Sequence, residues 1–188
     1  EAQNRYTRSV LDALPGAEAL RRAAGEIRTI EVPRFGELEA LRHAQACVVR
    51  TQWLFGAGGR NFVDTMLKLG PEKGSVKVVD DQRGCPTWSN HLAAGLWRLL
   101  ASDPAPGIWH LSARGACSWS QFASAIFREA GLAVAVSPCT TAEYPRPARR
   151  PRNGVLRNFR LELALGDFMP TWEEGLRGYL LERKGRGS

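Results

Sequence analysis

Side chains that could bind a ligand follow the first clearly apolar run of the chain. The run covers residues 47–49, and Arg50, Thr51, Gln52 and Trp53 come directly after it. Consecutive apolar positions are typical of a buried parallel strand. Open α/β sheets bind their ligands beyond the carboxyl ends of such strands, so the polar and aromatic residues here predict a binding site.

A second group of polar residues lies in a loop that glycine and proline make tight. Residues 80–87 read Asp-Asp-Gln-Arg-Gly-Cys-Pro-Thr. Gly84 and Pro86 favour a fixed turn, from which the Gln82 amide could hydrogen-bond a nucleotide base or a sugar. Thr87 is expected to cap the helix that follows. A generic turn is the alternative.

Asn61 stands at the start of a helical pattern. It is a suitable N-cap, and the positive end of the helix could also meet a ligand phosphate. A cap without a ligand contact is the alternative.

Six arginines lie within one short stretch of the chain. Guanidinium groups match phosphate oxygens, so the stretch predicts a site for a polyanion or a phosphorylated ligand, and a solvated basic loop is the alternative. Prolines rather than aromatic residues separate the arginines and no recognition motif is present, so a nucleic acid is not the expected partner. The six are Arg146, Arg149, Arg150, Arg152, Arg157 and Arg160.

Strands and helices are expected to alternate, which is typical of an α/β fold. The pattern predicts strands at residues 47–53, 76–79, 107–111 and 132–136, and helices at residues 61–69, 87–100, 118–130 and 170–181. Gly131 is expected just past the end of the third of these helices.

The composition is that of one sizeable globular core. The chain has 188 residues, of which 44% are hydrophobic, and a formal net charge of +7. No apolar run approaches the roughly 18 residues of a membrane span, and the first residues do not read as a secretory signal. The four cysteines and three histidines lack metal-ligand spacing. We expect free thiols, a cytoplasmic protein and no membrane partner.

The order of these motifs closely resembles the second half of the dTDP-4-dehydrorhamnose reductases, a branch of the extended short-chain dehydrogenase/reductases. Residues 61–67 resemble the family's Asn-Phe-Val-x-Thr-Met-Leu, residues 81–87 its Asp-Gln-x-Gly-x-Pro-Thr, and residues 143–151 its Glu-Tyr-Pro-x-Pro-Ala-Arg-Arg-Pro. The resemblance implies the late part of a doubly wound Rossmann-like parallel sheet plus a small α/β substrate-binding domain.

The same resemblance implies roles for single residues at the strand end and in the basic stretch. Thr51 and Gln52 would flank a nicotinamide, and Trp53 would form a wall against the sugar, since an indole face covers C–H bonds well; a core aromatic is the alternative for Trp53. Arg149 and Arg150 would hold the diphosphate by bidentate hydrogen bonds.

Three further assignments follow from the resemblance. Asn61 and Gln82 would be substrate-binding residues. Glu143 would be a ligand of a divalent cation, with Mg²⁺ as the candidate. The implied cofactor is NADPH or NADH, and the implied partner is a dTDP-sugar.

The sequence departs from the family at the residues that catalysis needs. Residues 6–11 resemble Tyr-Gly-Arg-Ser-Lys-Leu, in which the tyrosine donates a proton to the substrate carbonyl. Tyr6 is therefore the catalytic candidate, but Val10 occupies the lysine position; an ordinary tyrosine on a helix is the alternative. The Gly cluster at residues 56–59 lacks the spacing of a dinucleotide fingerprint. Arg157 stands where the family has an aspartate.

These observations lead to two hypotheses. In the first, the chain is a truncated reductase of dTDP-rhamnose and polysaccharide biosynthesis, an NAD(P)H-dependent oxidoreductase that keeps its sugar-nucleotide contacts. Residues 1–45 would be a remnant of the nucleotide-binding domain, residues 46–183 the sugar-nucleotide region and residues 184–188 a tail, and a homo-oligomer or a complementing chain would supply what is lacking. In the second, the chain is a non-catalytic nucleotide-sugar-binding or regulatory module.

Overall fold

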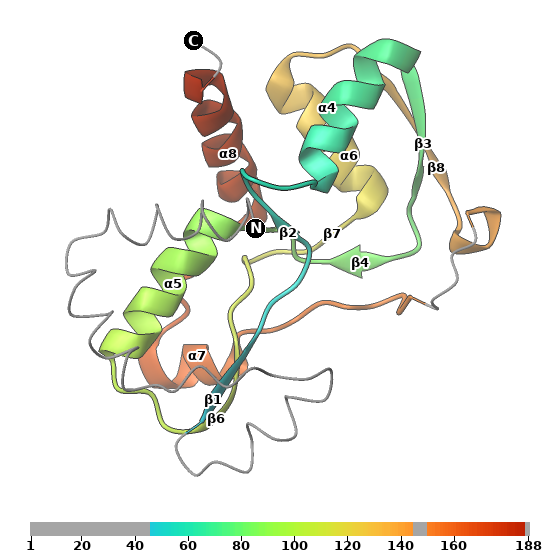
Figure 1. The fold of residues 1–188 in the computed structure, drawn as a ribbon. Coiled ribbons are helices and arrows are strands. Elements are labelled where there is room, and N and C mark those ends of the chain that lie inside the picture. Colours follow the sequence, from blue (N-terminus) through green and yellow to red (C-terminus); the bar gives the residue numbers. More distant parts are fainter. Residues whose placement is uncertain (1–45, 145–149, 187–188) are drawn as a thin grey trace.

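The computed structural model describes residues 46–144 and 150–186, and these form an α/β fold (Figure 1). The strands are β1 (Cys47–Arg50), β2 (Leu54–Phe55), β3 (Ser75–Val79), β4 (Arg83–Gly84), β5 (Thr87–Trp88), β6 (Gly107–His110), β7 (Cys117–Ser118) and β8 (Ala135–Cys139). The helices are α4 (Phe62–Lys73), α5 (Ser89–Ala101), α6 (Trp119–Ala130), the 3-10 turn η1 (Thr141–Glu143), α7 (Phe159–Leu165) and α8 (Trp172–Arg186).

The described strands form four separate pairs. Three pairs are parallel, β1 with β6, β2 with β5 and β3 with β8, and β4 with β7 is antiparallel. Each parallel pair is crossed over by helical segments, which is the connection that parallel strands require. The expected α/β class with parallel strands is therefore confirmed.

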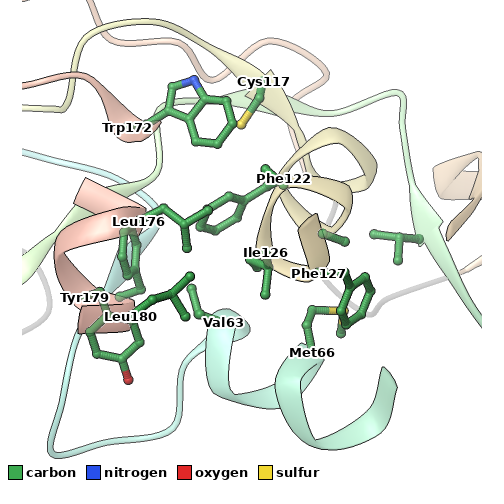
Figure 2. Packing of buried hydrophobic residues seen from close by; sticks show 14 of the residues in the cluster. Val63, Met66, Cys117, Phe122, Ile126, Phe127, Trp172, Leu176, Tyr179 and Leu180 are labelled. Atoms are coloured by element: carbon green, nitrogen blue, oxygen red, sulfur yellow. The ribbon is translucent and has the colours of Figure 1, made fainter. Parts of the chain in front are cut away.

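One core lies between α4, α6 and α8 (Figure 2). Phe122 of α6 is at its centre, with Phe55 and Trp172 in ring contact. Leu176 of α8 and Ile126 of α6 are fully buried in the same cluster. Because the helix faces close on one another here, this core holds α4 and α6 in place beside the β3–β8 pair (Figure 1).

A smaller core lies under β1 and β6. Trp109 and Leu111 pack there against α5 and α7, with Leu99 and Leu161 fully buried. Cys47, Val48 and Val49 are only half-buried, although their consecutive apolar positions are typical of a buried strand. Within the described residues β1 pairs with β6 alone, so one edge of β1 has no neighbouring strand.

Several element boundaries differ from those expected. The first strand ends at Arg50 and not at Trp53, because Trp53 has a left-handed backbone (φ 47°) that redirects the chain before β2. Helix α4 continues to Lys73, where left-handed Gly74 ends it by donating to the Gly70 carbonyl oxygen (2.8 Å). Gly131 ends α6 in the same way, as expected.

Other differences concern the second half of the chain. Strand β8 spans Ala135–Cys139 and not residues 132–136, in register with β3 from Ser75 onward. Helix α7 was not expected. The last helix begins at Trp172, since the side chains of Thr171 and Glu174 exchange hydrogen bonds with each other's backbone N–H groups.

Thr87 does not cap α5, contrary to expectation. Its side chain is fully buried, donates to the Cys85 carbonyl oxygen and accepts from the Ala113 N–H (both 3.0 Å). The Thr87 hydroxyl thus pairs two backbone groups, as buried polar groups require. Because the hydroxyl is used there, α5 starts at Ser89 without a side-chain cap.

All four cysteines are free thiols, as expected. Burial raises the pKa of Cys117 to about 12 and also raises the pKa of Cys85, so neither is a ready nucleophile. Among the described residues, none of the helices combines the length and apolarity needed to cross a bilayer.

His91 is expected to make the fold less stable in mild acid. Its ring packs against Trp88, and burial lowers its pKa below the ordinary 6.5, an effect that nearby Glu174 partly opposes. The unfolded chain therefore binds more protons below pH 6.5, so stability is complete above that pH and falls as the pH drops toward the folded-state pKa. Urea unfolding from about pH 7.5 to about pH 5.5 should show this loss, and His91→Gln should reduce it. Equal pH slopes for the two proteins would contradict the prediction.

Candidate functional site

Two adjoining hollows lie where the strand ends meet the loop of residues 80–87. The α4 hollow, of about 470 Å³, is lined by Phe62, Thr65, Met66, Leu69, Lys77, Val78, Val79, Gln82, Trp119, Tyr144 and Arg150. The β1 hollow, of about 830 Å³, is lined by Val49, Arg50, Thr51, Gln52, Trp53, Gln82, Arg83, Trp119, Arg150, Pro151, Gly154 and Leu156. Gln82, Trp119 and Arg150 line both hollows, so the two are neighbouring parts of one site.

The two hollows differ in chemical character. The α4 hollow has mostly apolar and aromatic walls with a few polar groups at hand, which suits a flat ring such as a nucleobase. The β1 hollow lies at the carboxyl end of β1, the usual ligand position in α/β sheets. The exposed Arg150 lies where the two meet.

Trp53 lines the β1 hollow as part of a stacked pair. Its ring lies on that of Trp119, with centroids 3.6 Å apart and planes inclined by 13°. A Cβ atom at Gly84 would lie only 2.5 Å from the Trp53 indole, so glycine is required beneath it. One indole face is thus taken by Trp119, and what remains of Trp53 can meet a ligand in the β1 hollow.

Gln82 is held by the turn that follows β8. Its Nε2 donates to Thr141 Oγ1 (2.9 Å), and this hydroxyl donates in turn to Asp81 Oδ1 (2.6 Å). The Thr141 hydroxyl is also the main cause that lowers the pKa of Asp81. Among the described residues, one N–H and the Oε1 of Gln82 have no recorded partner, so its lining position is compatible with the expected substrate contact.

The Glu143 carboxylate is already in use. Its Oε2 lies 2.6 Å from Lys77 Nζ, and its Oε1 accepts from the N–H and hydroxyl of Thr140. The hydrogen bond from Lys77 is the largest cause that lowers the pKa of Glu143 to about 2. No group of three or more His, Cys, Asp or Glu that could hold a metal occurs among the described residues. The surroundings of Glu143 therefore do not fit a magnesium ion.

Thr51 and Gln52 each have a buried polar atom that is unpaired within the described residues. Thr51 Oγ1 and Gln52 Nε2 are both buried and have no hydrogen-bond partner in the part of the chain that the structure describes. Buried polar groups are normally paired. The structure leaves these two atoms unpaired within the described residues, at the end of β1 where the sequence resemblance implies a nicotinamide.

Asn61 is the N-cap of α4, as expected. Its Oδ1 accepts from the Asp64 N–H (3.0 Å), and its Nδ2 donates to the Gly56 carbonyl oxygen (2.9 Å) and to Asp64 Oδ2 (2.7 Å). Tyr179 of α8 donates to the same carboxylate oxygen (2.7 Å), and burial together with this hydrogen bond raises the pKa of Tyr179 to about 12. Asn61 thus ties α4 to the chain before it, and it lines neither hollow.

The described arginines of the basic stretch do not form one cluster. Arg160 stacks on Trp109 (4.1 Å) and donates to backbone carbonyl oxygens, and Arg157 pairs with Glu162 (2.6 Å). Arg150 alone among the described arginines of this stretch lines a hollow. Tyr6, Arg146 and Arg149 lie outside the described residues.

Three lining residues were not expected from the sequence: Trp119, Lys77 and Tyr144. Trp119 lies in the helix expected at residues 118–130, for which the sequence predicted no ligand contact. The only available signal was its place next to Ser118, the N-cap of α6. A large aromatic residue at the start of a helix is common, so this position alone does not predict a ligand contact.

Comparisons with known proteins identify the family of this chain. The model of a family described as the RmlD substrate binding domain matches residues 36–184. The spore coat polysaccharide biosynthesis protein SpsK of Bacillus subtilis (strain 168) is 44% identical over 147 residues, which are 78% of this chain and 51% of that protein.

Two solved structures share the fold with substantial identity. The dTDP-4-dehydrorhamnose reductase of Clostridium acetobutylicum ATCC 824 has a TM-score of 0.71 at 45% identity, covering 74% of this chain and 49% of that one. The enzyme of Bacillus anthracis str. Ames, in complex with NADP, has a TM-score of 0.71 at 39% identity, covering 74% and 50%. The chain thus spans about half the length of these relatives. It belongs to the RmlD substrate-binding-domain family, whose named relatives here include dTDP-4-dehydrorhamnose reductases.

Proposed function

We propose that this chain is the sugar-nucleotide-binding part of a dTDP-4-dehydrorhamnose reductase, with residues 46–183 as the binding region. The observation that carries the proposal is the pair of adjoining hollows joined at Arg150. The thymine would lie in the α4 hollow, the diphosphate against Arg150 and the sugar in the β1 hollow. Relatives named for this substrate support the assignment.

The residues of the site would bind and orient the substrate. Arg150 offers two parallel N–H groups to phosphate oxygens. Gln82 offers one N–H and one carbonyl oxygen to the nucleotide or sugar, and Trp53 bounds the sugar. Holding the sugar in one orientation contributes to the rate, because it converts an encounter between free reactants into a reaction in a fixed geometry.

A bound nicotinamide cofactor would supply the hydride for reduction of the C4 keto group. Thr51 and Gln52 would face it with the two buried polar atoms that have no partner among the described residues. Tyr6 is proposed as the proton donor, with Val10 in place of the family's lysine. Cofactor contacts beyond the described residues would come from another part of the reductase, a second copy or a complementing chain, and the proposed place of the reaction is the cytoplasm.

A titration followed by tryptophan fluorescence tests this proposal. We expect dTDP to change the emission in a saturable way, since Trp53 and Trp119 line the hollows. A random oligonucleotide should have no saturable effect at physiological salt, where nonspecific contacts are weak. Absence of dTDP binding would overturn the proposal, and tight, steeply salt-dependent oligonucleotide binding would favour a nucleic-acid function instead.

A second measurement separates the reductase from a non-catalytic binding module. NADPH oxidation is followed with dTDP-4-dehydrorhamnose for the chain alone and after mixing with a related full-length reductase inactivated at its catalytic tyrosine. Turnover in either case supports the reductase. Binding of dTDP with no turnover in both would support the module.

A further inference from the structure

We propose that Trp119 is a ligand-contacting residue that also positions Trp53, and so links occupation of the α4 hollow to the shape of the β1 hollow. This inference rests on the proposed function, because it takes the two hollows as the nucleotide and sugar parts of one site. It adds a residue and a coupling that the family resemblance did not assign.

The backbone of Trp119 is fixed to the end of β3. Ser118, the preceding residue, forms a capping box with Gln121: Ser118 Oγ accepts from the Gln121 N–H (3.1 Å), and Gln121 Oε1 accepts from the Ser118 N–H (2.9 Å). The Ser118 hydroxyl also donates to Asp80 Oδ1 (2.5 Å). The start of α6 therefore cannot shift without breaking contacts to the strand end that forms the site.

The Trp119 side chain is the middle ring of a row of three. Phe62 of α4 contacts it at 4.6 Å between centroids, with the planes inclined by 54°, and Trp53 stacks on it at 3.6 Å. Phe62 lines the α4 hollow, Trp53 lines the β1 hollow, and Trp119 lines both. A nucleobase bound in the α4 hollow would therefore contact Trp119. Trp119 in turn stacks on Trp53, which is proposed to bound the sugar in the β1 hollow.

Trp53 needs this support because its backbone is in an unfavourable conformation. A φ of 47° is rarely adopted by a residue with a large side chain, and it persists only where the surroundings hold it. Trp119 covers one side of the indole, Gly84 leaves room for it, and the Trp53 carbonyl oxygen accepts from the Thr87 N–H (3.2 Å). Removing the Trp119 ring therefore removes the stacking contact of the Trp53 indole.

Binding of two ligands to four variants tests the proposal. The ligands are dTDP and dTDP-L-rhamnose, and the variants are Trp119→Ala, Trp119→Phe, Trp53→Phe and, as the control, Trp97→Phe. Trp97 lies on α5, is half-buried as Trp119 is, and lines neither hollow. The stacked indoles of Trp53 and Trp119 should also produce an exciton band in circular dichroism. Trp119→Phe and Trp53→Phe should each abolish this band, and the control Trp97→Phe should retain it.

The expected results differ between the two site tryptophans. Trp119→Ala should weaken dTDP binding about 10-fold, the size of a lost base–aromatic contact, and Trp119→Phe should recover part of it. Trp53→Phe should reduce mainly the extra affinity that the sugar confers, with a smaller loss of dTDP affinity because it alters the stack on Trp119. The Trp119 variants should reduce that extra affinity as well, because they release Trp53.

The outcomes separate this inference from the proposed function. If the wild-type chain binds dTDP and the Trp119 variants bind both ligands as the control does, the inference is wrong while the proposed function stands. If the wild-type chain binds no dTDP, the ligand contact falls together with the proposed function. An exciton band that survives Trp119→Phe would overturn the positioning of Trp53.

Discussion

Replacing Leu176 by alanine should lower the free energy of unfolding by about 2–5 kcal/mol, the range for large-to-small changes at buried leucines. Leu176 is fully buried between α8, α4 and α6 (Figure 2). The variant loses the transfer free energy of the removed methyl groups and leaves a cavity, which the ring contacts of Phe122 prevent from closing. Urea unfolding at equilibrium measures the change.

Leu163→Ala is the matched control for this prediction. Leu163 lies on α7 and is 73% exposed, so its replacement should change stability by less than about 0.5 kcal/mol. If Leu176→Ala and Leu163→Ala lowered the free energy of unfolding equally, the prediction that Leu176 of α8 packs in the core would be contradicted. A loss at Leu176 alone would show that the last helix is part of the body that holds α4 and α6, and with them both hollows.

Replacing Arg150 by alanine should weaken dTDP binding about 10- to 100-fold. Hydrogen bonds to a charged group are worth about 1.5–3 kcal/mol, and Arg150 is the described arginine at the junction of both hollows. Arg150→Lys should recover only part of the affinity, because an ammonium keeps the charge but loses the planar pair of N–H donors. Isothermal titration calorimetry with dTDP and with thymidine separates the diphosphate contribution from that of the base.

Arg128→Ala is the control for charge. Arg128 lies on α6, is exposed and pairs with neighbouring Glu129, away from both hollows. It should leave dTDP affinity unchanged. If Arg128→Ala weakened binding as much as Arg150→Ala, a general loss of positive charge would explain the effect and the specific role of Arg150 would be refuted. Thymidine binding should be nearly equal in the wild-type chain and in the variants Arg150→Ala, Arg150→Lys and Arg128→Ala.

The helix ends were the most predictable part of the fold. Asn61 and Gly131 are a cap and a stop whose chemistry is local: an amide oxygen pairs an N–H three residues on, and a glycine adopts a positive φ without a steric penalty. The break after Arg50 was not predictable in this way. It depends on a left-handed tryptophan, which the local sequence disfavours and which contacts with Trp119 and Gly84 hold in place.

The candidate site shows the same division. Trp53, Gln82 and Arg150 were expected from motif order, and they line the two hollows. Glu143 was expected to bind a cation, but Lys77, far away in the sequence, occupies its carboxylate. The arginines of the basic stretch could not be told apart from the sequence. In the structure Arg160 stacks on Trp109 and Arg157 forms a salt bridge with Glu162, so their guanidinium groups already have partners.

The amino-acid sequence by itself determined the α/β class, the Asn61 cap, the Gly131 stop and the family resemblance, because these depend on periodicity, capping and motifs over short spans of chain. The tertiary structure alone decided which polar groups are free to bind. A carboxylate, an amide or a guanidinium can form only a limited number of hydrogen bonds, and whether a distant residue has already taken them depends on how the chain folds back on itself.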